Sequence, residues 1–70
     1  MNMTSRRIMR HLSSHSGISE FELEKRIAMY DRTAAPGREF HQLVNAQPAY
    51  LAPDAIARTL QVALREYLWK

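Results

Sequence analysis

The chain has 70 residues and is 46% apolar, so we expect one small folded domain over residues 1–70 and not a disordered tail. It contains no cysteine, which excludes disulfides and thiolate metal sites, and its net charge of +3 permits an acidic partner without requiring one. No long apolar run follows the basic start, so we expect a cytoplasmic protein without a signal peptide or a membrane span.

The composition favours an all-α fold, because glycine is scarce and the alternating β-branched runs of strands are missing. The hydrophobic pattern predicts four short helices, which we expect to pack as a compact bundle. A chain of this size without cross-links often gains stability by self-association, so a homodimer is expected.

The first predicted helix starts at Thr4 or Ser5, either of which can cap it, and ends at about His15. Ile8 and Leu12 fall one turn apart on its inner side. A basic cluster lies on or near its far side and consists of Arg6, Arg7 and Arg10. This cluster can hold phosphates, or it can be the solvated face of a terminal helix.

A helix stop and a helix start follow each other after residue 16. Gly17 can take the left-handed conformation that closes the first helix. Ser19 and Glu22 have the spacing of a capping box. A second helix is therefore expected from residue 20 to residue 30 or 31.

The second predicted helix is apolar on two sides. One apolar line consists of Leu23, Ile27 and Tyr30. Another, on nearly the opposite side, consists of Phe21 and Ala28. A helix with this pattern is sandwiched, either inside the domain or between subunits. The glutamates of its first turns match the positive end of the helix dipole; they are Glu20, Glu22 and Glu24.

A connector with a Pro-Gly turn signal leads into a short third helix over residues 37–45. Phe40, Leu43 and Val44 form its apolar face. The opposite face carries a polar stripe at helical spacing, which consists of Arg38, His41, Gln42 and Asn45. Arginine pairs with guanine, and asparagine or glutamine with adenine, in the major groove of DNA. Any solvated helix can carry such a set, so the stripe has two interpretations.

The last predicted helix starts at Pro53 and Asp54 and runs to about Trp69. In the preceding loop, Tyr50 and Leu51 are expected to tuck into the core. The broad inner face of the helix consists of Ile56, Leu60, Ala63, Leu64, Tyr67 and Leu68.

An apolar surface is predicted on the outer side of this helix, where Val62 and Trp69 lie seven residues apart. An exposed tryptophan near a chain end often belongs to an interface. We therefore expect a dimer or partner surface with Val62, Leu68, Trp69 and, on the second helix, Phe21. The alternative is that Trp69 folds back over the edge of its own domain.

A metal site is not expected. His11 and His15 are one helical turn apart, a spacing that can bind zinc. No cysteine or acidic residue is expected near them to complete the site, and only His41 could join. No cofactor is expected either. The chain has no glycine-rich phosphate loop, no cysteine nucleophile and no Ser-His-Asp pattern with context, so we expect no enzyme.

Three stretches, residues 17–27, 40–48 and 51–60, follow one another as capped helix, polar-faced helix and Pro-Asp helix start. In this order they resemble the lambda-repressor/Cro-like helix-turn-helix regulators over about three quarters of the chain. The first is similar to the start of the motif, the second to its recognition helix, and the third to the entry into the next helix.

The resemblance implies a helix-turn-helix-like fold and a small DNA-binding transcription regulator of phage-repressor type, which acts as a homodimer by binding a promoter. By position it implies major-groove contacts by Arg38, His41, Gln42 and Asn45. It implies phosphate contacts by Arg32, Arg6 and Arg7. Dimerisation would use Val62, Leu68 and Trp69.

A protein-binding module is the alternative. The second helix starts with glutamates, and roughly seven residues separate Tyr30 from Arg38, where the motif has a shorter turn. A small helical adaptor or inhibitor of phage or plasmid type, which modulates a larger host protein, has the same features. Phe21 and the Val62/Trp69 surface would then bind that host protein.

Overall fold

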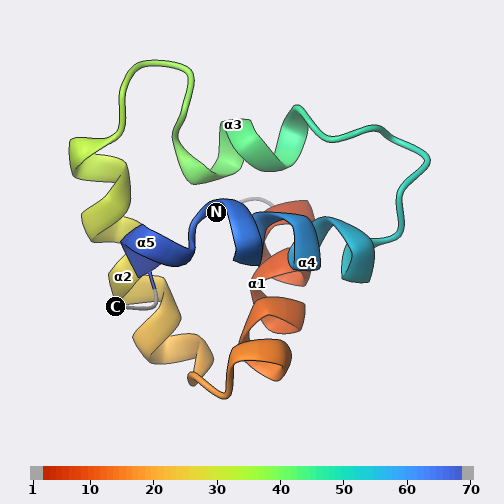
Figure 1. The fold of residues 1–70 in the computed structure, drawn as a ribbon, viewed down its shortest axis with the longest axis horizontal. Coiled ribbons are helices and arrows are strands. Elements are labelled where there is room, and N and C mark those ends of the chain that lie inside the picture. Colours follow the sequence, from red (N-terminus) through yellow and green to blue (C-terminus); the bar gives the residue numbers. More distant parts are fainter. Residues whose placement is uncertain (1–2, 69–70) are drawn as a thin grey trace.

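The computed structural model describes residues 3–68, and residues 1–2 and 69–70 lie outside the described part. The described chain folds into five helices and contains no strand, which confirms the all-α prediction. The helices are α1 (Met3–Ser16), α2 (Glu20–Thr33), α3 (Phe40–Asn45), α4 (Pro53–Ala63) and α5 (Arg65–Leu68) (Figure 1). No helix within residues 3–68 combines the length and the apolar composition needed to cross a membrane.

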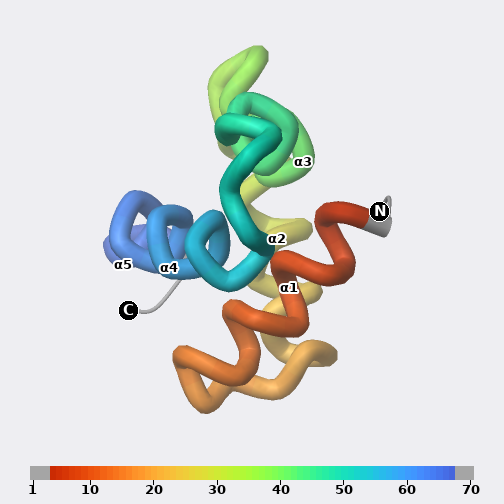
Figure 2. The backbone as a smooth tube through the Cα atoms, turned by 90° about the vertical axis from the view of Figure 1, so that its right-hand side faces the viewer, coloured from red at the N-terminus to blue at the C-terminus, as the bar shows by residue number. Residues whose placement is uncertain are grey.

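Helix α1 packs against α2, α3 and α4 (Figure 2). Its contact with α4 is the most extensive helix pair of the described chain. Ile8 and Leu12 of α1 are fully buried, as their spacing predicts. They join one apolar cluster, whose other members are Met9, Leu23, Ile27, Phe40, Val44, Ile56, Ala57, Leu60 and Leu64.

The junction between α1 and α2 follows the local signals. Gly17 has φ +74°, so it ends α1 in the left-handed region. The hydroxyl of Ser19 accepts a hydrogen bond of 3.1 Å from the backbone N–H of Glu22 and caps α2. The start of α1 differs from the prediction, because Thr4 and Ser5 lie inside the helix. Ser5 is fully buried, since its small side chain faces the core and does not cap the helix.

The connector between α2 and α3 contains a hydrogen-bonded turn. Helix α2 extends to Thr33, two residues beyond the predicted end. Gly37 has φ +86°, and the N–H of Arg38 donates a hydrogen bond of 2.9 Å to the carbonyl of Ala35. Proline followed by such a glycine is the pattern of a type II turn. The hydroxyl of Tyr30 donates a hydrogen bond of 2.7 Å to the carbonyl of Arg38 and ties this turn to α2.

The predicted last helix is two helices, so the prediction of four helices is wrong. Helix α4 ends at Ala63, and Leu64 has φ −103° and ψ 11°, outside helical geometry. This bend keeps Leu64 in the core while α5 turns towards α2. There the ring of Tyr67 packs edge-on against that of Tyr30, with centroids 5.7 Å apart. Tyr67 was expected on the inner face but is 68% exposed, and Ala63 is exposed as well.

The loop between α3 and α4 is only partly as predicted. Leu51 packs against the core, whereas Tyr50 is 87% exposed and was wrongly expected to be buried. Pro53 occupies the first turn of α4, next to Asp54, as the sequence indicates.

Candidate nucleic-acid interface

Helix α3 is held by contacts at its N-terminal end. The backbone N–H of Phe40 donates a hydrogen bond of 2.9 Å to Asp31 Oδ1 of α2. Glu39 and Gln42 form a reciprocal capping box, in which Glu39 N–H lies 3.3 Å from Gln42 Oε1. Phe40 and Val44 bury the inner side of the helix. A helix of this length is unstable alone, so these contacts determine its orientation.

The four polar residues predicted on one helical stripe differ in their exposure and in whether they lie on α3. His41 and Asn45 are exposed on α3. Arg38 is exposed too, but it lies in the turn ahead of the helix, because the Pro-Gly turn and the Asp31 cap delay the helix start to Phe40. Gln42 is half-buried, and its side-chain oxygen is used in the cap. The prediction that these four residues form one continuous stripe on a helix is therefore wrong.

An open hollow lies between the start of α1, the end of α3 and the start of α4. Arg7 of α1 and Asn45 of α3 both line it, although they lie far apart in the sequence. Its apolar wall consists of Ile8, Val44, Leu51 and Ile56. The fold thus brings a guanidinium group and a carboxamide to one surface.

The arginines of the described chain fall into two groups. Three lie within 4.0 Å of a carboxylate: Arg10 with Glu20 at 3.8 Å, Arg26 with Glu22 at 3.4 Å, and Arg58 with Asp54 at 3.1 Å. Within residues 3–68, the exposed arginines without an ion pair are Arg6, Arg7, Arg32, Arg38 and Arg65. The first four of these are the arginines that the sequence singles out as DNA contacts.

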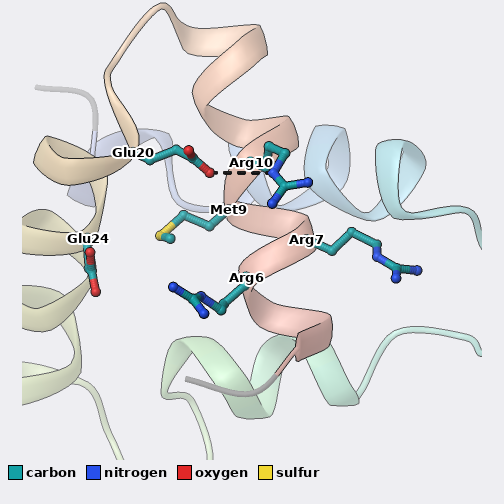
Figure 3. Close-up of a pocket in the computed structure, with 6 residues that line it drawn as sticks. All are labelled: Arg6, Arg7, Met9, Arg10, Glu20 and Glu24. Carbon is teal, nitrogen blue, oxygen red and sulfur yellow. Dashed lines mark ion pairs between the residues drawn. The ribbon is translucent and has the colours of Figure 1, made fainter.

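A hollow lined by arginines of α1 and glutamates of α2 lies between these two helices (Figure 3). Arg10 points to Glu20 at its edge, and Arg6 lies on the side that faces Glu24. Arg7 points away from both glutamates. The acidic start of α2 therefore neutralises Arg10 more than it does Arg7.

The residues predicted for a dimer or partner surface lie on different elements. Phe21 is 69% exposed on α2, with Lys25 Nζ 4.5 Å above its ring centre. Val62 is 67% exposed on α4. Leu68 is the last residue of α5, and Trp69 lies outside the described residues.

A further exposed apolar surface was not predicted. Met29 of α2 is 67% exposed, and together with Tyr30 and Tyr67 it lines a shallow hollow between α2 and α5. The bend at Leu64 creates this hollow by turning α5 onto α2, so no local sequence signal could reveal it.

A cluster of two histidines and one carboxylate joins α1 to α4. His15 Nε2 lies 2.7 Å from Asp54 Oδ1, and His11 Nδ1 lies 3.3 Å from the same oxygen. The expectation that no acidic residue is near these histidines is therefore wrong. The hydrogen bond from His15, with help from Arg58 and against opposing desolvation, lowers the pKa of the Asp54 carboxyl.

His41, the only residue that the sequence offered as a third ligand, lies on α3, where its Nδ1 is 3.8 Å from Glu39 Oε2.

Comparison of the chain with protein-family models found no match. Comparisons with curated proteins and with solved structures found no significant similarity either.

Proposed function

We propose that this chain is a small DNA-binding transcription regulator of phage-repressor type, which acts by occupying a promoter. The observation that carries the proposal is the placement of the four exposed, unpaired arginines around α3. Arg6 and Arg7 lie in the first turns of α1, next to α3 (Figures 1 and 2). Arg32 lies in the last turn of α2, and Arg38 in the turn before α3.

Phosphate contacts by these arginines would supply most of the affinity. An arginine without a carboxylate partner can neutralise a DNA phosphate at no cost in broken ion pairs, and each such contact releases counterions. Arg10, in contrast, would first have to leave Glu20. The proposal therefore assigns backbone contacts to Arg6, Arg7 and Arg32, in line with the resemblance to helix-turn-helix regulators.

Base contacts are assigned to α3 and the turn before it. In this proposal α2 and α3 form a helix-turn-helix pair with a long turn, and α3 enters the major groove. His41 and Asn45 face outwards, and Asn45 has the donor and acceptor pair that recognises adenine. Arg38 would read guanine at the N-terminal end. Gln42 is assigned a supporting role, because its oxygen already caps the helix.

Two copies are needed for a specific site. Helix α3 has six residues and is about 9 Å long, so one copy can read only about three base pairs. A homodimer reads two half-sites about 34 Å apart. The molecule measures 29 × 28 × 21 Å, so two copies side by side can match that spacing. The proposed dimer surface contains Val62 on α4 and, towards the chain end, Leu68 and Trp69.

A protein-binding adaptor or inhibitor is the second candidate. Phe21 is the observation that favours it, since an exposed phenylalanine on the acidic half of α2 has no role in the DNA proposal. The two candidates differ in what nuclease does to complexes captured from a lysate. A complex that survives nuclease and is lost in Phe21→Ala supports the adaptor. A complex that nuclease removes supports the regulator.

Fluorescence anisotropy with a labelled duplex of mixed sequence at low salt tests the DNA proposal. The variants Arg7→Gln and Arg32→Gln each remove one proposed phosphate contact. Lys25→Gln is the matched control, because it removes one positive charge from the middle of α2, away from α3. We expect weaker binding and a salt slope smaller by about 1 for each arginine variant, whereas Lys25→Gln should bind DNA like the wild type. Equal effects of all three variants would contradict the proposal.

A further inference from the structure

We propose that His11, His15 and Asp54 form a zinc-binding site that links α1 to α4. The three ligand atoms lie within 4.8 Å of one another. Tetrahedral zinc with nitrogen and oxygen ligands at 2.0–2.2 Å needs ligand atoms about 3.3 Å apart. His11 Nδ1 and Asp54 Oδ1 already have that separation, at 3.3 Å. His15 Nε2 lies 2.7 Å from the same oxygen and would move outwards by about 0.6 Å to reach that separation.

The two histidines are held by the same helix. Their spacing of four residues places both imidazoles on one side of α1, one turn apart. Leu12, between them in the sequence, is fully buried and fixes the rotation of α1. A rigid helix therefore carries both histidine rings, so less conformational entropy is lost when an ion binds.

The carboxylate comes from the first turn of α4, which is packed firmly on α1. Pro53 begins that turn, and Ile56 and Ala57 are buried behind Asp54. Arg58 Nε binds Asp54 Oδ2 at 3.1 Å, so the other oxygen, Oδ1, faces the histidines. A contact of this kind orients a ligating carboxylate, as partners in the outer shell of metal sites do. The positive charge of Arg58 opposes the ion and limits its affinity.

The donor set identifies zinc as the ion. Two imidazoles and one carboxylate suit zinc, whereas magnesium and calcium prefer all-oxygen sites. The side chains of His11, His15 and Asp54 are 38%, 23% and 46% exposed, so an ion can reach them, and water can fill the fourth position. The site lies apart from α3, so this inference does not depend on the proposed function.

The consequence of zinc binding is stabilisation of a small domain that has no disulfide. A bound ion would cross-link α1 and α4, which lie far apart in the sequence. At a zinc concentration about a hundred times the dissociation constant, the melting temperature should rise by roughly 10 °C. Magnesium should produce no such rise.

Isothermal titration calorimetry and thermal unfolding, each with zinc chloride or with chelator, test the site. We expect one zinc per chain for the wild type. His11→Gln should weaken zinc binding at least about tenfold and remove most of the thermal shift. Asp54→Asn should do the same. His41→Gln is the matched control, because it removes a half-exposed histidine beside Glu39, outside the cluster, and should bind zinc like the wild type.

His11 is the most exposed of the two cluster histidines, so His11→Gln is expected to fold, and its helix content in chelator checks this. The proposal would be overturned by no zinc binding by the wild type, by equal zinc binding by wild type and folded His11→Gln, or by loss of binding in His41→Gln. A stoichiometry of one zinc per two chains would also overturn it, because the site would then lie between molecules.

Discussion

Asp31 Oδ1 accepts a hydrogen bond of 2.9 Å from the backbone N–H of Phe40, so a side chain of α2 caps the first turn of α3. The preceding residue, Tyr30, binds the carbonyl of Arg38 at 2.7 Å. Two consecutive residues of α2 thus hold the turn and the start of α3. Any partner that binds α3 binds an element whose orientation α2 determines.

Replacing Asp31 by alanine should loosen α3. The loss of a capping side chain costs about 1 kcal/mol, which lowers the melting temperature of a domain of this size by roughly 4–8 °C. DNA affinity should fall as well, because α3 would no longer be held in place. Circular dichroism melts and anisotropy measure both effects. The neighbouring Arg32→Ala should weaken DNA binding without changing the melt, and identical melts of Asp31→Ala and wild type would refute the capping role.

Gln42 and Asn45 should respond differently to replacement by alanine. Gln42→Ala removes half of the capping box with Glu39, so it should destabilise the fold by up to about 1 kcal/mol and weaken binding to all sequences alike. Asn45→Ala should leave the melt unchanged and relax the preference at one base pair by about 1–3 kcal/mol. Binding to a library of single-base variants of a selected site distinguishes the two patterns. If Gln42→Ala changed the base preference instead, their roles would be reversed.

Val62 tests the dimer. A glutamate at this exposed position on α4 would meet its own copy across a two-fold interface and would bring like charges into apolar surroundings. Val62→Glu should therefore be a monomer at concentrations at which the wild type is a dimer, as measured by sedimentation equilibrium. Met29→Glu, at a position with the same 67% exposure on α2, is the control and should stay dimeric. Unchanged mass for Val62→Glu would place the interface elsewhere.

Acid should remove the contribution of Asp54 in the presence of chelator. Its pKa is lowered in the folded chain, mainly by the hydrogen bond from His15, so the carboxylate stabilises the fold above its ordinary pKa of 3.8. That stabilisation is lost as the pH falls through the lowered pKa of the folded state. The melting temperatures of wild type and Asp54→Asn should therefore differ above pH 3.8 and converge as the pH falls below the lowered pKa of the folded state. Glu24→Gln, which removes a carboxylate outside the cluster of His11, His15 and Asp54, is the control. A difference between wild type and Asp54→Asn that persists in acid would contradict the role assigned to Asp54.

Local signals in the sequence predict much of this fold. Gly17, the Ser19 cap, the Pro-Gly turn and Pro53 each act on their own few residues, and the structure has all four where the sequence places them. The buried positions Ile8 and Leu12 follow from helical spacing alone. These features are predictable because their physical cause lies within one or two turns of chain.

The features that were missed depend on contacts between distant residues. Asp54 meets His15 across 39 positions, and no periodicity indicates such a contact. The bend at Leu64 turns α5 onto α2, an element distant in the sequence. Arg38 leaves the helix because Asp31 caps Phe40 from another element. The candidate interface could thus be predicted as a set of residues, but not in its arrangement.

The proposed role as a regulator rests on one claim, that DNA binds at the surface formed by the start of α1 and by α3. Titration of isotope-labelled protein with a duplex, followed by amide chemical shifts in NMR spectra, tests it most directly. We expect the shifts to concentrate at residues 6–7, 32 and 38–45. Amides around Phe21 and Val62 should move little at a fixed ratio of DNA to dimer. No shifts at low salt, or shifts confined to the surroundings of Phe21, would contradict the claim.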